Sequence, residues 1–221
     1  KKNKDTVALK KIFDAFQNAT DAQRTFREIM YLQGLTGHEN IIRLQNVLKA
    51  ENDKDIYLVF DYMETDLHAV IRAGILQDIH KHYIMYQTLK ALFYMHSAAL
   101  VHRDMKPANV LIKDNGYAVL IDFGLAAKMD TALKGKCGTR GYWSPETINK
   151  SKYQFEPDWW SLGVMITELI TGKKPFKKRL QKFKNLDDKV KIDEDGGVED
   201  TIEERDIEAK LGAATQIDDD G

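Results

Sequence analysis

The chain has 221 residues, enough for one ordinary domain or two lobes of one enzyme, and 43% are hydrophobic, which suffices for a core. Its formal net charge of −1 gives no overall attraction to nucleic acid or to an anionic membrane. One cysteine, Cys137, excludes an intrachain disulfide framework and favours a reducing compartment. No stretch is apolar over the roughly 18 residues that a membrane span needs, and the charged N-terminus lacks a signal core. We therefore expect an intracellular protein without a membrane span.

The first third of the chain carries strand and helix patterns in turn. Residues 6–12, TVALKKI, form a β-branched run that predicts a strand. Residues 20–37 predict a helix, because they open with a good N-cap and stop at Gly37. Its apolar face would consist of Phe26, Ile29, Met30 and Leu32. Residues 41–50 and 55–63, separated by ENDK, predict two antiparallel strands.

Helical patterns dominate the rest. Residues 77–97 predict a long buried helix with one apolar stripe: Ile84, Met85, Leu89, Leu92, Phe93 and His96. Residues 110–121 predict a hairpin around Asp114–Asn115–Gly116, and residues 158–171 predict a strongly apolar helix. Strands come first and helices later, so we expect an α+β fold in two unequal parts.

Composition changes abruptly after Phe176. Of the 45 residues in 177–221, 23 are Asp, Glu, Lys or Arg, with no aromatic residue beyond Phe183. Such a segment buries too little surface to offset its ordering entropy, so we expect a largely disordered tail with a marginal helix around 199–211. Its basic stretch KKRLQKFK also suggests, as a weak alternative, binding to a phosphoinositide surface.

The stretch VHRDMKPANVLI (101–112) holds many polar groups between apolar flanks. Phosphoryl transfer from ATP requires positive charge on the phosphates, oxygen ligands for Mg²⁺ and a carboxylate near the attacking hydroxyl. Asp104 can accept the hydroxyl proton and Lys106 can neutralise the transferred group. Asn109 and Asp122 are hard oxygen ligands suited to Mg²⁺, and the hairpin between them predicts that both emerge at one edge.

Four motifs then resemble the signature set of eukaryotic protein kinases: V-A-L-K (7–10), H-R-D-M-K-P-A-N (102–109), D-F-G (122–124) and S-P-E (144–146). Each is weak alone, since a lone strand lysine is usually solvated and an Asp before Phe-Gly is more often turn chemistry. Their common order reverses that judgement. The resemblance implies a two-lobed kinase fold, incomplete here, with residues 1–63 as partial N-lobe and hinge, 64–176 as partial C-lobe and 177–221 as the charged tail.

The same resemblance implies roles for individual residues. Lys10 would bind the α- and β-phosphates and pair with Glu28, and Asp158 would anchor the catalytic loop. The adenine would lie against the following residues: Ala8 and Leu111 on its two faces, Phe60 as gatekeeper, and Asp61, Tyr62 and Met63 as the hinge. We interpret His102 as a packed structural residue, and the spacing of His80 and His82 does not indicate zinc.

Residues 5–125, including METDLHAVI, resemble MAP kinases, in particular the atypical extracellular-signal-regulated kinases. The activation segment lacks their Thr-x-Tyr, and CGTRGYWSPE with DWWSLGVMITELITGKKPF is more similar to AGC kinases. The family's glycine-rich loop and later C-lobe helices are absent from this sequence. We therefore expect weak nucleotide binding and little catalysis from the chain as given, with buried Glu146 deprived of an arginine partner.

The resemblance implies a serine/threonine protein kinase in signal transduction that uses ATP and Mg²⁺, acts on protein substrates rather than nucleic acid, and resides in the cytoplasm or also the nucleus. The alternative is a kinase-derived nucleotide-binding or scaffold module without turnover. Arg103 would receive a phosphate from the activation segment. We expect Thr131 to be its only acceptor, because Thr139 should be engaged with Lys106, and Trp143 predicts no strong need for proline after the substrate hydroxyl.

Overall fold

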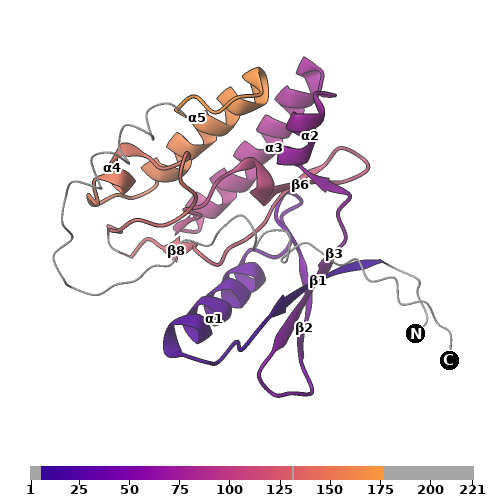
Figure 1. Cartoon of the computed structure of the whole chain (residues 1–221), viewed down its shortest axis with the longest axis vertical. Helices are drawn as coiled ribbons and strands as arrows, with labels where there is room; N and C mark the ends of the chain where they lie inside the picture. The colour runs from indigo at the N-terminus through magenta and orange to yellow at the C-terminus, as the bar shows by residue number, and fades with distance from the viewer. Residues whose placement is uncertain (1–5, 131, 177–221) are drawn as a thin grey trace.

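The computed structural model describes residues 6–130 and 132–176, and these form two unequal parts (Figure 1). One part is an antiparallel sheet with a helix beside it, and the other is mainly helical. The predicted α+β class is confirmed, whereas domain boundaries at residues 63 and 176 stay a prediction. The predicted tail, its helix at 199–211 and its basic stretch lie outside the described residues.

The elements are β1 (Val7–Ile12), α1 (Ala19–Gly34), β2 (Leu44–Lys49), β3 (Ile56–Asp61), β4 (Thr65–Asp66), α2 (Leu67–Ala73), α3 (Asp78–Ser97), β5 (Leu100–Val101), η1 (Pro107–Asn109), β6 (Val110–Ile112), β7 (Ala118–Leu120), β8 (Ala127–Lys128), α4 (Pro145–Ile148) and α5 (Glu156–Thr171).

The sheet of the smaller part has the strand order β1-β3-β2, with both pairs antiparallel. β3 is central and largely buried, which suits its apolar sequence IYLVFD. The predicted strand 41–50 starts only at Leu44, because Ile41 and Ile42 leave the sheet. Ile41 bridges to Leu120, and the Ile42 amide donates to the Leu120 carbonyl at 3.0 Å. These two residues therefore join the smaller part to β7 of the larger one.

α1 begins and ends slightly earlier than predicted. Asn18 is its N-cap, whose Oδ1 accepts a hydrogen bond from the Asp21 amide at 2.9 Å. The predicted apolar face is wrong in part, because Phe26 is 65% exposed and Met30 is also exposed. The buried residues of α1 are instead Thr25, Glu28 and Leu32. The helix is thus turned so that a carboxylate, not a phenyl ring, faces the sheet.

The core of the larger part lies between α3, α5 and the β6–β7 hairpin. α3 contributes Ile84, Leu92 and Met95, but Leu89 and Phe93 are exposed, so the predicted stripe is wrong at those two residues. α5 starts two residues before the predicted helix, with Pro157 in its first turn, where proline is well tolerated. This start places Asp158 in the first helical turn, fully buried.

α2 is a helix that the sequence analysis did not predict. Asp66 caps it, since its Oδ1 accepts from the Ala69 amide at 2.9 Å, and it ends at Gly74 with φ of 65°. An Asp eight residues before a Gly is a signal that could have found this short helix. Among residues 6–130 and 132–176, no helix is both long and apolar enough to cross a membrane.

Asp55 links the start of β3 to the end of β1. Its carboxylate lies 2.9 Å from Lys11 Nζ and accepts hydrogen bonds from the Asp14 amide at 3.0 Å and from Asn52 Nδ2 at 2.9 Å. The bond from Lys11, followed by those from Asp14 and Asn52, lowers the pKa of Asp55 to about 2. A carboxylate with a depressed pKa stabilises the fold above its unfolded pKa of about 3.9 and loses that effect as the pH falls towards 2.

We expect Asp55→Asn to lower the free energy of unfolding at pH 6, because the ionised form makes these contacts. The difference between parent and variant should shrink as the pH falls from about 4 towards 2. Urea unfolding at a series of pH values measures this. Asp53→Asn is the matched control, since Asp53 lies in the same turn but is highly exposed in its ion pair with Lys49. A difference for Asp55→Asn that stays constant across the pH series would contradict the assignment.

Candidate active site

The loop that follows β5 is fixed by one buried carboxylate. Asp158 Oδ2 accepts from the His102 amide and Oδ1 from the Arg103 amide, both at 2.8 Å, and His96 Nε2 lies 2.9 Å from Oδ2. Arg103 has φ of 68°, a left-handed conformation that is unfavourable for a residue with a side chain. The two hydrogen bonds from adjacent amides to Asp158 stabilise this turn.

His102 connects that loop to the end of β7. Its Nδ1 accepts from the Asp104 amide at 3.2 Å, so its Nε2 carries the proton and donates to the Ile121 carbonyl at 2.9 Å. The ring is fully buried and packs edge-on against Phe123 at 5.4 Å. The interpretation of His102 as a packed structural residue is confirmed.

The carboxylate of Asp104 makes hydrogen bonds through both of its oxygens. Its Oδ1 accepts from the Thr139 amide at 2.8 Å and from Thr139 Oγ1 at 2.7 Å. Its Oδ2 lies 3.1 Å from Lys106 Nζ and 3.2 Å from Asn109 Nδ2. Lys106 Nζ also donates to Thr139 Oγ1 at 2.7 Å, so the expected contact between Thr139 and Lys106 is present. These bonds fix the direction of the carboxylate, which is buried.

The β6–β7 hairpin brings Asn109 and Asp122 to one edge. Val110 pairs with Leu120, and the Ile121 amide donates to the Asn109 carbonyl at 3.0 Å. Asn109 Nδ2 donates to the Asp104 carbonyl at 2.7 Å as well as to Oδ2. With its amide nitrogen held by Asp104, Asn109 presents Oδ1 as its remaining ligand atom. Asp122 has φ of 63°, and Phe123 behind it is fully buried.

Lys10 on β1 lies between two carboxylates. Its Nζ is 2.7 Å from Glu28 Oε1 and 3.8 Å from Asp122 Oδ1. Burial acts to lower the pKa of Lys10, but the charges of Glu28 and Asp122 outweigh it, so the pKa is raised. The expected pair between Lys10 and Glu28 is therefore present, and Asp122 from the larger part adds a second partner.

The residues predicted to contact adenine come from three strands. Ala8 on β1 pairs with Phe60 on β3, and Leu111 on β6 pairs with Asp66. Ala8 and Leu111 are half-buried, whereas Phe60 belongs to the core. Asp61 ends β3 ahead of Tyr62 and Met63, but its carboxylate is held by Arg43 at 2.8 Å and by Gln45, and the bond from Arg43 lowers its pKa. The Asp61 side chain is therefore engaged elsewhere, and only the Asp61 backbone is available for the predicted hinge contact.

The comparisons with known proteins agree with this geometry. Residues 1–211 match the sequence model of a family described as "Protein kinase domain". The chain belongs to the protein kinase family. It is 58% identical over 186 residues to "Extracellular signal-regulated kinase 2" of Dictyostelium discoideum, covering 80% of the chain and 50% of that protein.

Two further relatives are also mitogen-activated or extracellular signal-regulated kinases. "Mitogen-activated protein kinase 15" of Xenopus laevis is 50% identical over 80% of the chain and 32% of its own length. "Extracellular signal-regulated kinase 7" of Drosophila melanogaster is 43% identical over 80% of the chain and 21% of its own length. The resemblance to MAP kinases is confirmed, and the chain spans half or less of the length of these relatives.

The segment that leads from Asp122 to α4 packs against the loop that holds Asp104. Arg103 Nε donates to the Leu125 carbonyl at 2.7 Å. Glu146 is half-buried in α4 rather than fully buried, so solvent reaches the carboxylate and the expected penalty of an unpaired buried charge is wrong. Thr131, the expected phosphate acceptor, lies outside the described residues.

Sequence reasoning missed a buried pair between this segment and α5. Tyr142 Oη donates to Glu168 Oε2 at 2.6 Å, and Ser161 Oγ donates to the Tyr142 carbonyl at 2.8 Å. Burial, with the neighbouring carboxylate, raises the pKa of Tyr142, so the phenol stays protonated and donates. The signal was Glu168 within the apolar helix ITELIT, because a buried carboxylate requires a donor.

Gly138 lies in close contact with the loop that holds Asp104. Its φ is +85°, and a Cβ there would lie 2.3 Å from the Arg103 carbonyl oxygen. Gly135 has φ of +112° with no heavy atom within 4 Å of such a Cβ, so it matches the backbone strain without the close approach.

We expect Gly138→Ala to reduce the free energy of unfolding by more than Gly135→Ala does. Both variants carry a left-handed alanine, at roughly 1–3 kcal/mol, but only Gly138→Ala also has to displace the Arg103 carbonyl. Urea unfolding of the two variants and the parent provides the comparison. Equal losses of unfolding free energy in the two variants would contradict the prediction, because they would show that the close contact with the Arg103 carbonyl adds no cost.

Proposed function

We propose that the chain is a serine/threonine protein kinase module of MAP kinase type, transferring the γ-phosphoryl group of ATP to a protein hydroxyl. The observation that carries this proposal is the arrangement around Asp104. A buried, oriented carboxylate lies beside an ammonium group, Lys106, and accepts a hydrogen bond from the side-chain amide nitrogen of Asn109. Membership in the protein kinase family supports the same reaction.

Asp104 would accept the proton of the attacking serine or threonine hydroxyl as its oxygen bonds to the γ-phosphorus, and ADP would leave with the electrons of the broken bond. Lys106 would bind the transferred group. Lys10, held by Glu28, would bind the α- and β-phosphates. A magnesium ion, when bound, would supply positive charge to the phosphate oxygens, and Asn109 with Asp122 would hold it.

The donor chemistry at Asn109 and Asp122 fits magnesium. Mg²⁺ is commonly bound through one or two protein oxygens together with phosphate oxygens. The adenine would lie between Ala8 and Leu111, beside Phe60, with the backbone of Asp61 to Met63 as its hydrogen-bonding edge. The orientation of the Asp61 side chain towards Arg43 is consistent with that use of the backbone.

The protein substrates and the place of action follow from the same proposal. We expect Ser/Thr acceptors in cytoplasmic or nuclear proteins, and regulation through a phosphate that Arg103 receives. Thr131 remains the acceptor that the sequence predicts. The Nε of Arg103 is already bound to Leu125, so its terminal guanidinium nitrogens would carry that contact.

Asp104→Asn and Asp122→Asn should separate chemistry from nucleotide binding. Asparagine at 104 keeps the shape but cannot take the proton, so transfer should fall roughly 10²–10⁴-fold with ATP affinity unchanged. Asp122→Asn should instead weaken the affinity for Mg·ATP. Calorimetric titration with nucleotide and transfer of labelled phosphate to a protein substrate measure the two effects.

Asp114→Asn, on the exposed turn of the same hairpin, is the control and should change neither quantity. Full activity of Asp104→Asn would refute the proposed base. Because little catalysis is expected without a glycine-rich loop, the same test is run on the chain extended N-terminally by such a loop, and nucleotide binding without any transfer there would favour the alternative, a kinase-derived nucleotide-binding module.

Trp143 generates a prediction about the substrate. The MAP kinase pattern has an arginine at this position, which shapes a pocket that tolerates proline after the acceptor. Here Trp143 is half-buried, the Arg140 guanidinium lies 5.6 Å from its ring, and its Nε1 is buried without a hydrogen-bond partner among residues 6–130 and 132–176. An indole cannot reproduce the directional bonds of a guanidinium.

We expect Ser/Thr acceptors without a strong requirement for a following proline. Loss of one polar anchor typically shifts discrimination by roughly 1–3 kcal/mol, enough to remove a ten- to hundredfold preference. A positional-scanning peptide library gives the preference directly, with Trp143→Arg as the variant expected to gain selectivity for proline. Dominant selection of proline by the parent would show that Trp143 does not set specificity.

A further inference from the structure

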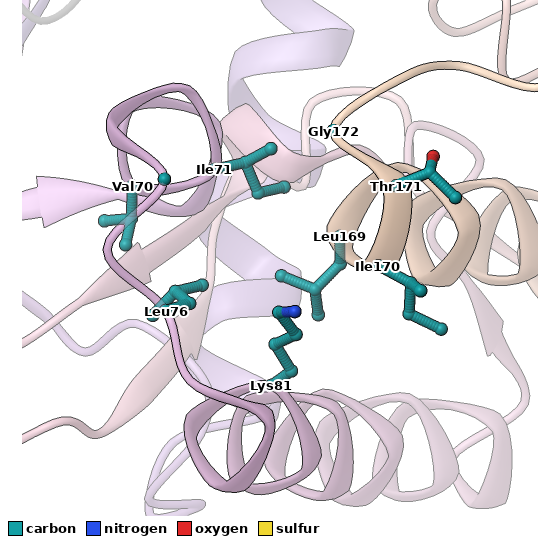
Figure 2. A pocket seen from close by; sticks show the side chains of 9 residues that line it. Val70, Ile71, Leu76, Lys81, Leu169, Ile170, Thr171 and Gly172 are labelled. Carbon is teal, nitrogen blue, oxygen red and sulfur yellow. The ribbon is translucent and has the colours of Figure 1, made fainter.

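A pocket of about 230 Å³ opens between α2, the start of α3 and the end of α5, away from the candidate active site. Its apolar walls are Val70, Ile71, Leu76, Leu169 and Ile170. Figure 2 shows Lys81 extending from α3 into this space, with its Nζ beside Leu169. The roles proposed for the active-site residues leave this pocket without a function.

The size and charge of the pocket limit its occupant. Small-molecule sites usually measure roughly 300–1,000 Å³, so this pocket suits an aliphatic side chain better than a cofactor. The Lys81 side chain is only 23% exposed, and its one ion-pair partner in the described residues, Asp78, is 86% exposed at 3.1 Å. Arg72 and Lys173 directly follow lining residues in the sequence. The pocket therefore favours an aliphatic anchor with acidic neighbours.

The chain itself contains such a segment. Residues 192–207, IDEDGGVEDTIEERDI, hold eight acidic residues and one basic residue, with isoleucine or valine as their only large apolar side chains. By contrast, residues 177–191 hold seven basic residues and two acidic ones. The acidic segment thus matches the pocket in charge and in anchor size, whereas the basic segment also holds aliphatic residues but carries the wrong charge.

The attachment point favours binding within one molecule. Gly172 lines the pocket, and the described part of the chain ends four residues later, at Phe176. Thirty residues separate Gly172 from Ile202 in the middle of the acidic segment. For linkers of thirty residues in general, the root-mean-square span is about 30 Å, and a tether of that reach corresponds to a roughly millimolar effective concentration.

We propose that the acidic segment 192–207 docks on this pocket of its own chain, with Ile202 inserted between α2 and α5 and Glu203 and Glu204 placed against Lys81. The docked segment would hold α2 to the end of α5. Its release, by salt or by a competing acidic peptide, would expose the pocket to other proteins.

Disulfide trapping tests the contact in the full 221-residue chain. Cys137 is the only cysteine, so Cys137→Ser gives a clean background for Ile170→Cys paired with Ile202→Cys. Ile170 is an exposed pocket residue, and its replacement leaves the core intact. The matched control pairs Ile170→Cys with Leu180→Cys, which is much nearer along the chain.

Chain proximity alone would oxidise the Leu180→Cys pair faster, and its basic neighbours would favour the reactive thiolate. We expect the Ile202→Cys pair to form at least tenfold faster within the monomer. Equal or faster closure at Leu180→Cys would overturn the proposal. Disulfide-linked dimers as the main product would overturn it in favour of a second copy.

Charge reversal provides an independent check. Lys81→Glu alone, or Glu203→Lys with Glu204→Lys, should slow trapping several-fold, and the three changes together should restore it. High salt should slow only the parent and the restored combination. Thermal unfolding confirms that each variant is folded. Trapping rates that stay the same in all of the charge-reversal variants would exclude the charge contact and with it the proposed docking.

Discussion

The buried carboxylate of Asp158 is the constraint on which the candidate site depends. It accepts the amides of His102 and Arg103 and lies against His96, so the turn before Asp104 can occupy a left-handed conformation. A buried charge is tolerated only when donors surround it, and here the donors are the backbone that must be positioned. Helix α5 thus carries the acceptor, Asp158, and α3 supplies the third donor, His96. The loop that follows β5 has no regular structure before η1, and these hydrogen bonds to Asp158 hold its backbone instead.

Two connections transmit that order to the smaller part. The β6–β7 hairpin carries it from Asn109 to Asp122, and His102 reinforces the link through the Ile121 carbonyl. Lys10 then joins Asp122 to Glu28 across the boundary between the parts, while Ile41 and Ile42 pair with Leu120 nearby. The turned face of α1 follows from this arrangement, because Glu28 has to point inward where an apolar stripe would place Phe26.

The sequence predicted what depends on local patterns and on motif order. Strands 6–12 and 55–63, the hairpin and the long helices come from periodicity, and the Lys10–Glu28 pair, the Thr139–Lys106 contact and the anchoring by Asp158 come from the family resemblance. Short elements such as α2 and β4 were missed, since two to seven residues give too little period to detect. The prediction that Phe26 and Phe93 lie on buried helix faces was wrong, because hydrophobicity alone cannot tell which side of a helix packs against the rest of the protein. The Tyr142–Glu168 bond was missed because its partners lie 26 residues apart and meet only after folding.

The charges of the site are balanced before any ligand is considered. Lys10 lies between Glu28 and Asp122, and Lys106 lies against Asp104, so each cation already has a carboxylate partner. Isolated buried charges would destabilise the fold by several kcal/mol each, and this pairing avoids that penalty. On the proposed function, phosphates and magnesium would exchange partners with these groups rather than meet them unpaired. Lys10 would turn from Asp122 towards phosphate while Asp122 turned to the metal. The 3.8 Å separation of Lys10 and Asp122, longer than the 2.7 Å of Lys10 and Glu28, is consistent with the former contact being the one that yields.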